Sequence, residues 1–252
     1  MIDAPSRPVT IVTGGSRGIG AAISLELARE GHDVVLNFAS DEAAAVELAG
    51  RIEALGGRCL PVRADVTDEE QVEELFARAA TLGPVTGLVN NAGATSFIGD
   101  LADTPVAVIR RVIELNLVGT VLCCRLAART MSRSRGGRGG AIVNITSLAA
   151  ATGSPHTYVH YAAAKAGVET LTRGLAVELG PEGVRVNAVS PGIVRTTIHA
   201  DAGDAGRVDR AVPGIPLRRA GLPEDIAPTV AHALSERASY MSGAVITVSG
   251  GL

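Results

Sequence analysis

The opening segment of the chain constrains its fold more than any other part. A short apolar run rich in β-branched residues, at residues 7–13, leads directly into Gly14-Gly15-Ser16-Arg17-Gly18-Ile19-Gly20, and a helical pattern follows at residues 21–30. A strand, a glycine turn and a helix start in this order form a phosphate site. Bare backbone N–H groups and the positive helix end face the anion, and the glycines let it approach closely. The alternative is a tight turn that only glycine can make. The strand before the turn and the helix after it favour a dinucleotide site.

Alternating strand and helix patterns continue to the end of the chain without a linker. Further strands are expected at residues 33–39, 58–63, 85–90, 141–146, 184–189 and 244–248, and further helices at residues 41–55, from 68 onward, 105–132, 157–179 and 223–237. Ser40 and Thr67 are expected to cap the helices that follow them, and residues 134–140 to form a solvated loop. Apolar strands that alternate with helices indicate a parallel sheet covered on both faces. The sequence therefore predicts a single domain over residues 1–252 of the α/β class, a doubly wound Rossmann-type domain whose seven-stranded parallel sheet carries helices on both faces.

Composition excludes several classes of function. The formal net charge of −3 gives no reason to expect a nucleic acid or an anionic membrane as partner. No apolar stretch is long enough to span a membrane, and the N-terminal residues lack the basic and apolar regions of a signal peptide. The three cysteines, Cys59, Cys123 and Cys124, suit a reducing cytoplasm and match no metal-site spacing. We therefore expect a cytoplasmic protein without a metal, in which Cys123 and Cys124 are small core or interface residues.

Tyr161 and Lys165 form the most informative pair of side chains. They are four residues apart, so on a helix they project from one face. A tyrosine is a poor acid–base group at neutral pH because its ordinary pKa is about 10. A positive charge at roughly 4 Å, at an effective dielectric constant of about 20, would favour the phenolate by about 4 kcal/mol, or roughly three pKa units. The pair therefore predicts a tyrosine that exchanges a proton near neutral pH. The alternative is a solvated tyrosine and lysine on an ordinary helix.

Several short segments follow the expected strand ends. They are the glycine turn, Asp65, Asn90-Asn91-Ala92-Gly93, Ser147 and Pro191-Gly192. Ligands of parallel sheets bind beyond the carboxyl ends of the strands. These segments should therefore gather at one rim of the molecule.

The motifs together resemble one family. The spacing Gly14-x3-Gly18-x-Gly20 departs from the usual G-x-G-x-x-G. With Tyr161-x3-Lys165 it is similar to the short-chain dehydrogenase/reductase family, in its compact single-domain branch. The segments at residues 90–93, 115–117, 144–147 and 191–192 fall in the family's order, and the resemblance covers residues 7–252. The overall likeness is to the 3-oxoacyl-carrier-protein reductases and the glucose or sugar dehydrogenases of this family.

The resemblance implies roles for four residues. Tyr161 would be the general acid when a carbonyl is reduced and the base when an alcohol is oxidised, and Lys165 would lower its pKa and bind the nicotinamide ribose. Ser147 would donate a hydrogen bond to the substrate oxygen, where negative charge develops. Asn116 would hold a water that joins Lys165 to solvent. Taken alone, Asn116 is equally a helix-kink residue and Ser147 a strand-end turn residue.

The resemblance also implies a set of cofactor contacts. Asp65 and Val66 would lie at the adenine, and Asn91 and Gly93 at the middle of the cofactor. The full expected set is Gly14, Ser16, Arg17, Gly18, Ile19, Gly20, Ser40, Asp65, Val66, Asn91, Gly93, Tyr161, Lys165, Gly192, Val194 and Thr196.

The end of the second expected strand bears on the choice between NADP and NAD. An NAD enzyme usually places an acid there to bind the ribose hydroxyls. Here residues 36–40 contain no acid before Asp41, and an acid introduced at Asn37 is expected to face the ribose. Arg17 carries a charge that suits a 2′-phosphate. We therefore expect NADP(H), with NAD(H) as the alternative, because Asp41 is one residue away and NAD-using relatives also carry an arginine at this place.

The substrate is less constrained by the sequence. In the family, the region matching residues 193–222 closes over the substrate, and Thr196, Thr197, Ile198 and His199 are candidate wall residues. The segment His156-Thr157-Tyr158-Val159-His160 concentrates histidine and tyrosine just before Tyr161. These side chains would suit a sugar or another polyhydroxyl substrate. Equally, they would serve to pack the loop onto the next helix.

Assembly and function follow from the resemblance. Compact members usually pair the helices that match those of Asn116 and Tyr161 between subunits, which implies a homotetramer, with a dimer as the alternative. The small residues at 162–164 and 166–167 would allow this close packing, or would equally pack within the chain. The expected function is NADP(H)-dependent hydride transfer to or from a small carbonyl or alcohol. The alternatives are a catalytically silent cofactor-binding regulator and an epimerase or dehydratase of the longer branch.

Overall fold

Seven parallel strands form one sheet in the computed structural model, which describes residues 7–252. The strand order is β3-β2-β1-β4-β5-β6-β7. The strands are β1 (Val9–Val12), β2 (Asp33–Phe38), β3 (Cys59–Arg63), β4 (Val85–Asn90), β5 (Gly140–Ile145), β6 (Val184–Pro191) and β7 (Val245–Val248). The predicted doubly wound α/β sheet is therefore confirmed. Residues 1–6, considered above for a signal peptide, lie outside the described residues.

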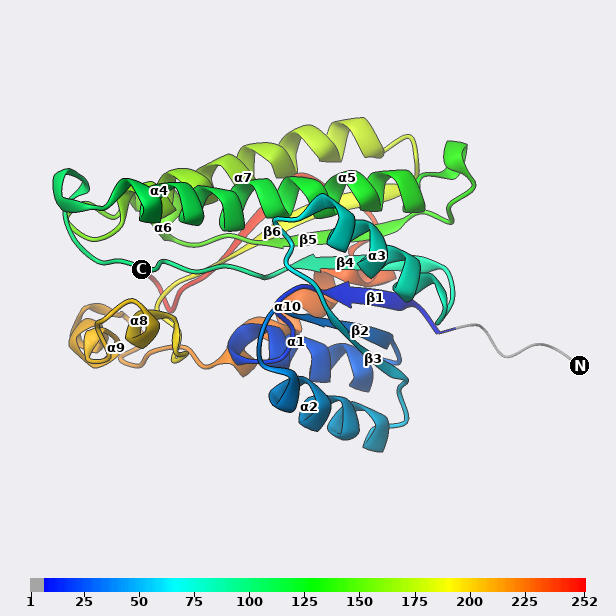
Figure 1. Cartoon of the computed structure of the whole chain (residues 1–252), viewed down its shortest axis with the longest axis horizontal. Coiled ribbons are helices and arrows are strands. Elements are labelled where there is room, and N and C mark those ends of the chain that lie inside the picture. Colours follow the sequence, from blue (N-terminus) through cyan, green and yellow to red (C-terminus); the bar gives the residue numbers. More distant parts are fainter. Residues whose placement is uncertain (1–6) are drawn as a thin grey trace, which may run out of the picture.

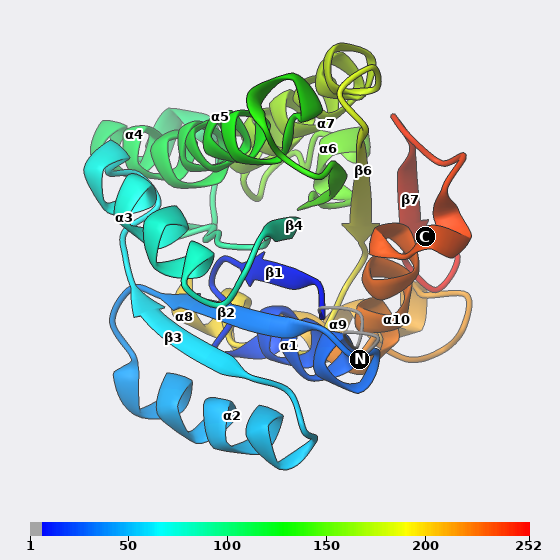
Figure 2. The ribbon, with the colours of Figure 1, turned by 90° about the vertical axis from the view of Figure 1, so that its right-hand side faces the viewer.

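Helices cover both faces of this sheet (Figures 1 and 2). One face carries α1 (Gly18–Arg29), α2 (Glu42–Ala54) and α10 (Pro223–Leu234). The other carries α3 (Glu69–Ala80), α4 (Val106–Ile113), α5 (Gly119–Met131) and α7 (Val159–Leu179). The short helices α6 (Ala149–Thr152), α8 (Ile198–Asp201) and α9 (Arg207–Ala211) lie on the loops at the carboxyl ends of the strands.

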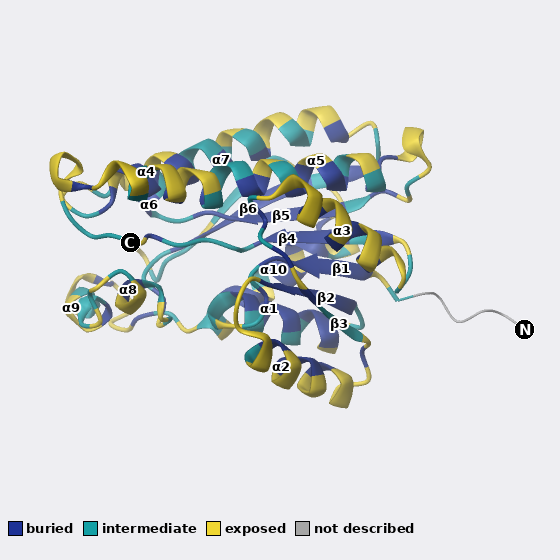
Figure 3. Ribbon diagram, in the orientation of Figure 1, coloured by how far each residue is buried: buried dark blue, intermediate teal, exposed yellow. Residues whose placement is uncertain are grey.

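The central parts of the strands are mainly apolar because they contribute to two hydrophobic layers. Val12 and Leu36 pack in the layer with α1 and α10, whereas their neighbours Ile11 and Val35 pack in the layer with α3 and α5. Successive side chains of a strand point to opposite faces, so both kinds of position must be hydrophobic here. Figure 3 shows the result, with buried strands between helices whose outer faces are exposed.

The expected helix at residues 105–132 is one helical run with an irregular centre. A π-helical turn, η2 (Glu114–Val118), separates α4 from α5, and Asn116 lies inside it. A π-turn releases a backbone group from the regular ladder and is common at functional positions. The kink interpretation of Asn116 therefore describes its backbone correctly.

Two predicted helix caps are wrong. Asp41, not Ser40, caps α2 by accepting the backbone N–H of Ala44 at 3.0 Å. Asp68, not Thr67, caps α3 by accepting two backbone N–H groups of its first turn. In both cases the carboxylate at the next position reaches the free N–H groups better and also opposes the positive helix end.

Other element boundaries differ by a few residues. α7 begins at Val159, α10 ends at Leu234, and β6 extends to Pro191. Residues 133–135 form a short 3-10 turn, η3 (Arg133–Arg135), within the expected loop. The expected loop over residues 193–222 contains α8, α9 and the 3-10 turn η4 (Val212–Gly214).

Several small residues of α7 pack within the chain, whereas Ala163 is exposed. Ala162 and Ala164 are buried, and a Cβ on Gly167 would stand 3.1 Å from Leu117 of η2. Cys123 and Cys124 are likewise buried in the layer with α3, as core residues. Among residues 7–252, no helix is both long enough and apolar enough to cross a membrane.

Candidate active site

The glycine turn between β1 and α1 has a shape that side chains would obstruct. Gly14 and Gly18 have φ values of +58° and +53°, in the left-handed region that favours glycine. A Cβ on Gly20 would collide with the carbonyl oxygen of Gly14 and stand 2.5 Å from Nδ2 of Asn91. The backbone of the turn is therefore left bare toward the cavity, as the sequence predicts.

The start of α1 is free to bind an anion. Its N-cap residue, Arg17, makes no side-chain capping bond, and the first turn contains no acidic residue. The first N–H groups of a helix need an outside acceptor, and the helix dipole favours a negative one. The turn and the uncapped helix fit the pyrophosphate of a dinucleotide.

Two asparagine side chains hold this turn in place. Nδ2 of Asn91 donates to the carbonyl oxygens of Thr13 and Gly14 at 3.0 and 2.9 Å. Oδ1 of Asn37 accepts the N–H of Gly14 at 3.2 Å, and its Nδ2 donates to the carbonyl oxygen of Ala64 at 2.9 Å. Asn37 is buried and ties the glycine turn to the next strand connection, and it lines the cavity together with the exposed Ala39 and Ser40. That an acid at position 37 would face the ribose stays a prediction, and such an acid would have to give up these bonds.

The opposite wall at this end contains Asp65, which hydrogen bonds hold in position. Its carboxylate accepts from the backbone and hydroxyl of Thr67 at 3.0 and 2.8 Å and lies 3.3 Å from Arg111. Burial opposes its ionisation, but these bonds outweigh that effect and hold the pKa of Asp65 below its ordinary value. Arg17 meets Asp201 of α8, with 3.4 Å between Nη1 and Oδ2. Both partners are largely exposed, so this ion pair is a weak one.

Tyr161 and Lys165 lie one turn apart on α7, and both are buried, with 6% and 3% of their surfaces exposed. The Lys165 Nζ atom is 5.8 Å from the centroid of the Tyr161 ring and donates to the carbonyl oxygen of Ile145 at 2.9 Å. Burial lowers the pKa of Lys165 to about 8. Burial also raises the pKa of Tyr161 above its ordinary value, and Tyr158 adds to the rise while a hydrogen bond with Ser147 partly offsets it.

The predicted lowering of the Tyr161 pKa by Lys165 is therefore wrong for the chain alone. The prediction assumed a charge at roughly 4 Å in a medium of dielectric about 20. In the structure both groups are desolvated, which penalises the phenolate and the ammonium alike.

Asn116 and Gly93 lie behind this pair. Nδ2 of Asn116 donates to the carbonyl oxygens of Ala94 and Val112, both at 2.8 Å. Its Oδ1 is buried and has no hydrogen-bond partner among residues 7–252. A Cβ on Gly93 would stand 2.6 Å from that oxygen and 3.4 Å from the Lys165 Nζ. Gly93 thus leaves the space in which Asn116 and Lys165 face each other.

Ser147 follows β5, and its hydroxyl lies beside that of Tyr161. Its Oγ also accepts the backbone N–H of Ala149 at 3.2 Å, which orients the side chain. The strand-end turn interpretation and the catalytic interpretation are therefore compatible, since the turn presents the hydroxyl to the cavity.

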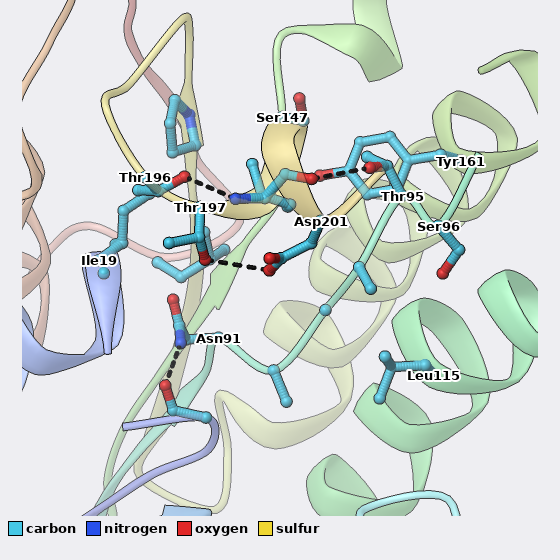
Figure 4. Close-up of a pocket in the computed structure, with 18 of the residues that line it drawn as sticks. Ile19, Asn91, Thr95, Ser96, Leu115, Ser147, Tyr161, Thr196, Thr197 and Asp201 are labelled. Carbon is cyan, nitrogen blue, oxygen red and sulfur yellow. Dashed lines mark hydrogen bonds between the residues drawn. The ribbon is translucent and has the colours of Figure 1, made fainter. Parts of the chain in front are cut away.

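A cavity of about 500 Å³ connects these parts. Figure 4 shows Tyr161, Ser147 and Thr95 at one end and Ile19 of the glycine turn at the other. Every predicted cofactor residue lines it except Gly20, whose position is inside the turn, and Asn116 lies behind the wall. Gly192 and Val194 are among these predicted residues. A Cβ on Gly192 would stand 2.8 Å from the Cα of Ser249, and Val194 forms a β-bridge with Gly221. Thr196, Thr197, Ile198 and His199 also line the cavity, as predicted.

The segment at residues 156–160 contributes one residue to the cavity, Tyr158. His156 is exposed and pairs with Asp100 at 2.8 Å, and His160 is buried in α7. Within this segment Tyr158 and His160 are buried, whereas His156 and Val159 are exposed, and a role of Tyr158 toward a polyhydroxyl substrate stays a prediction. The Tyr158 ring meets the Tyr161 ring edge to face, with 5.3 Å between centroids.

Sequence reasoning missed several residues of the cavity wall. Thr95, Ser96, Arg111, Ser154, Asp201 and Arg207 all line it. Ser96 and Ser154 have positive φ values, a rare conformation for a serine, and lie in loops without a periodic pattern. Among residues 7–252, no group of three or more histidine, cysteine, aspartate or glutamate side chains is arranged to hold a metal ion.

Comparison with known proteins gives the family. Residues 14–252 match the family described as "Enoyl-(Acyl carrier protein) reductase". The uncharacterized oxidoreductase YgfF of Escherichia coli (strain K12) is 43% identical over 244 residues, which cover 96% of this chain and 99% of that protein. The chain belongs to the short-chain dehydrogenase/reductase family.

Other relatives agree with this assignment. The L-rhamnose 1-dehydrogenase (NAD(P)(+)) of Sphingomonas sp. (strain SKA58) is 38% identical over 244 residues, covering 96% of this chain and 94% of that protein. The crystal structure of a blue fluorescent protein from a metagenomic library, in complex with NADPH, has a TM-score of 0.88 and 35% identity, with 97% of each chain covered. As a short-chain dehydrogenase/reductase, the chain is an oxidoreductase that acts on alcohol or ketone groups, and a catalytically silent regulator is not favoured.

Proposed function

We propose that this chain catalyses NADP(H)-dependent hydride transfer to or from the carbonyl or secondary alcohol of a small molecule, with Tyr161 as general acid and base. The observation that carries the proposal is the arrangement of the cavity. Tyr161 and Lys165 stand buried at one end, and a glycine turn with an uncapped helix start forms the other. Bound NADP(H) would supply or accept the hydride. The residues of the chain orient the reactants and move the proton.

The proton is held on the Tyr161 hydroxyl. Its raised pKa keeps Tyr161 protonated at neutral pH, so it is ready to donate to a carbonyl oxygen. Lys165, with a pKa of about 8, carries its charge at neutral pH and stabilises the phenolate that this donation leaves. The hydroxyl of Ser147 donates to the same oxygen as negative charge develops on it.

Asn116 serves to return the proton. The free Oδ1 of Asn116 and the Nζ of Lys165 face the same space beside Gly93. A Cβ on Gly93 would stand 2.6 Å from the oxygen and 3.4 Å from the nitrogen, so the two atoms are at most about 6 Å apart. One water can bridge such a gap with two hydrogen bonds of ordinary length. This path would carry a proton to Lys165 and then to Tyr161.

The preference for NADP(H) rests on charge at the adenosine end. Arg17 is exposed there, and its pairing with Asp201 is weak enough to yield to a phosphate. Asp41 is engaged as the cap of α2. Ala39 and Ser40 present no negative charge to repel a 2′-phosphate.

Exchange of Tyr161 for phenylalanine tests the proposal. The Tyr161→Phe variant should bind NADPH normally but lose about 10²- to 10⁴-fold in kcat, because general acid catalysis is lost. Turnover is followed by NADPH absorbance with a panel of ketones, secondary alcohols and sugars, including L-rhamnose. Tyr240→Phe is the matched control, since Tyr240 is fully exposed. A Tyr161→Phe variant with near-normal kcat would overturn the assignment.

We also propose a cytoplasmic homotetramer. Hydrophobic side chains remain exposed on the outer helices, among them Val106 of α4, Val121 of α5 and Val177 of α7. Faces of this kind suit contacts between subunits. Light scattering coupled to size-exclusion chromatography measures the mass, and a monomer would contradict the proposal.

A further inference from the structure

Arg207 places a positive charge at the substrate end of the cavity. It begins helix α9, and its guanidinium carbon lies 5.1 Å from the centroid of the Tyr158 ring. Its Nη2 is 3.4 Å from the Tyr158 hydroxyl. Because the Tyr158 ring in turn packs on Tyr161 at 5.3 Å, the guanidinium lies within about 10 Å of the Tyr161 ring. A small substrate that reacts at Tyr161 would therefore extend to Arg207.

In the part of the chain that the structure describes, Arg207 has no carboxylate partner, unlike three other arginines of its segment, and unlike Arg218, which is also unpaired, it lines the cavity. In the same segment Arg195 pairs with Asp209, Arg210 with Asp204 and Arg219 with Asp225. Over residues 7–252, no carboxylate oxygen lies within 4.0 Å of the Arg207 guanidinium. Its Nε is buried and has no hydrogen-bond partner within the same range. Arg207 as a whole is partly exposed, so its other N–H groups are open to an acceptor, while the desolvated Nε–H lacks one in the described chain.

The charged and titratable groups nearby leave this one positive charge in place. Asp204 is engaged by Arg210 at 2.5 Å, although the charge of Arg207 also contributes to lowering the pKa of Asp204, and Asp201 accepts from Thr197 at 3.0 Å. His199 is buried, and its Nδ1 has no partner among the described residues. Burial and the charge of Arg207 lower the pKa of His199, so it is neutral at pH 7.

We propose that the substrate carries a carboxylate, which Arg207 binds while the reacting alcohol or carbonyl lies at Tyr161. This inference rests on the proposed function and specifies the substrate class. The planar guanidinium, already oriented by the Tyr158 ring, presents N–H groups in the geometry that a carboxylate accepts. A single unpaired charge balances a monoanionic carboxylate but leaves a phosphate dianion half neutralised. The carboxylate is therefore separated from the reacting carbon by several bonds, matching the span from Tyr161 to Arg207.

A binding experiment isolates the charge from the chemistry. Calorimetric titration compares cyclohexanecarboxylate with cyclohexanecarboxamide, which has nearly the same shape, on the full chain saturated with NADP⁺ in physiological salt. The wild type should bind the carboxylate about 10-fold or more tightly than the amide, the effect of one charge-assisted hydrogen bond. Arg207→Met should abolish this preference, and Arg207→Lys should retain part of it. Arg78→Met is the matched control, because Arg78 is exposed on α3 and outside the cavity.

Kinetics separate recognition from positioning. With 3-hydroxycyclohexanecarboxylate and cyclohexanol as a matched pair, Arg207→Met should raise KM for the acid about 10-fold or more and lower kcat/KM for cyclohexanol much less. An equal loss on both substrates would show that Arg207 only positions Tyr158, and would overturn the proposal. Equal wild-type binding of carboxylate and amide, or tighter binding of cyclohexyl phosphate than of the carboxylate, would overturn it as well. A carboxylate preference without turnover of any alcohol would refute the proposed hydride transfer and leave the anion site standing.

Discussion

Replacing Lys165 with methionine should abolish turnover and yet stabilise the fold at neutral pH. Lys165 is the only lysine in the sequence, and its ammonium is almost completely buried without a carboxylate partner in the described chain. Such a charge is retained for its chemistry, and it weakens the folded state. Methionine has a similar length and volume and carries no charge, so the packing of α7 should persist.

The magnitude follows from the pKa of Lys165. Burial lowers it from 10.5 to about 8, and each unit corresponds to 1.36 kcal/mol, so the protonated side chain costs the folded state about 3 kcal/mol. Methionine removes this cost but leaves the carbonyl oxygen of Ile145 without its donor, a loss of about 1 kcal/mol. Lys165→Met should therefore be about 2 kcal/mol more stable than the wild type at pH 7.

The sign of the pH dependence gives a second measurement. Between pH 8 and 10.5 the unfolded chain still binds the proton of Lys165 while the folded chain does not. Stability rises with pH wherever the unfolded state binds more protons, so the wild type should gain on the variant across this window. The advantage of Lys165→Met, full below pH 8, should vanish between about pH 9 and 10, and above pH 10.5 the variant should be about 1 kcal/mol less stable than the wild type, because only the lost bond to Ile145 remains.

Equilibrium unfolding in denaturant, at equal protein concentrations and at pH 7 and 10, measures both quantities. The ε-carbon signal of labelled lysine, unique in this chain, gives the pKa directly by NMR titration. Arg78→Met, on the exposed face of α3, controls for loss of a positive charge. A variant no more stable than the wild type at pH 7, or a difference that does not change between the two pH values, would refute the reasoning.

Four further substitutions test the cavity wall. Arg17→Ala should lower the preference for NADPH over NADH by roughly 10- to 150-fold, and Ala39→Asp should shift that preference toward NADH. Both effects are measured as ratios of kcat/KM for the two cofactors. Equal effects of Arg17→Ala on the two cofactors would make Arg17 a turn residue only. Asn37→Asp should destabilise the fold by about 1–3 kcal/mol at pH 7, because a buried carboxylate replaces the donor to the carbonyl oxygen of Ala64. This loss of stability should shrink as pH falls and the carboxyl is protonated. An unchanged unfolding midpoint would contradict this prediction. Gly93→Ala would place its Cβ 2.6 Å from the Asn116 Oδ1, so kcat should fall while the Kd for NADPH changes less. Stopped-flow kinetics measure kcat, and fluorescence titration measures the Kd. A normal kcat would remove Asn116 from the proton path.

The parts of the site that the sequence predicts are those with a local cause. The glycine turn is local because Gly14 and Gly18 must adopt positive φ values at fixed positions. The Tyr161–Lys165 pair is local because a four-residue spacing on any helix brings two side chains to one face. Strand ends gather at one rim because every strand of the sheet is parallel.

What the sequence did not predict depends on the direction and burial of single side chains. A strand pattern places Asn37 near the end of β2, but the choice between cavity and interior depends on its bonds to Gly14 and Ala64. The pKa of Tyr161 depends on how completely the surrounding loops exclude water, which no spacing reveals. Burial raises the pKa of Tyr161 in the structure, so the four-residue spacing predicts the partners correctly and the sign of the shift wrongly.

Arg207 is the strongest case of this limit. It lies in a segment with several arginines, and the sequence offers no period that would distinguish one of them. Only the folded arrangement shows that three of its neighbours meet carboxylates while Arg207 turns to the Tyr158 ring with a buried, unused N–H. The reaction class therefore follows from residues whose spacing is fixed by backbone geometry. The substrate class follows from a charge that the fold leaves unpaired beside them.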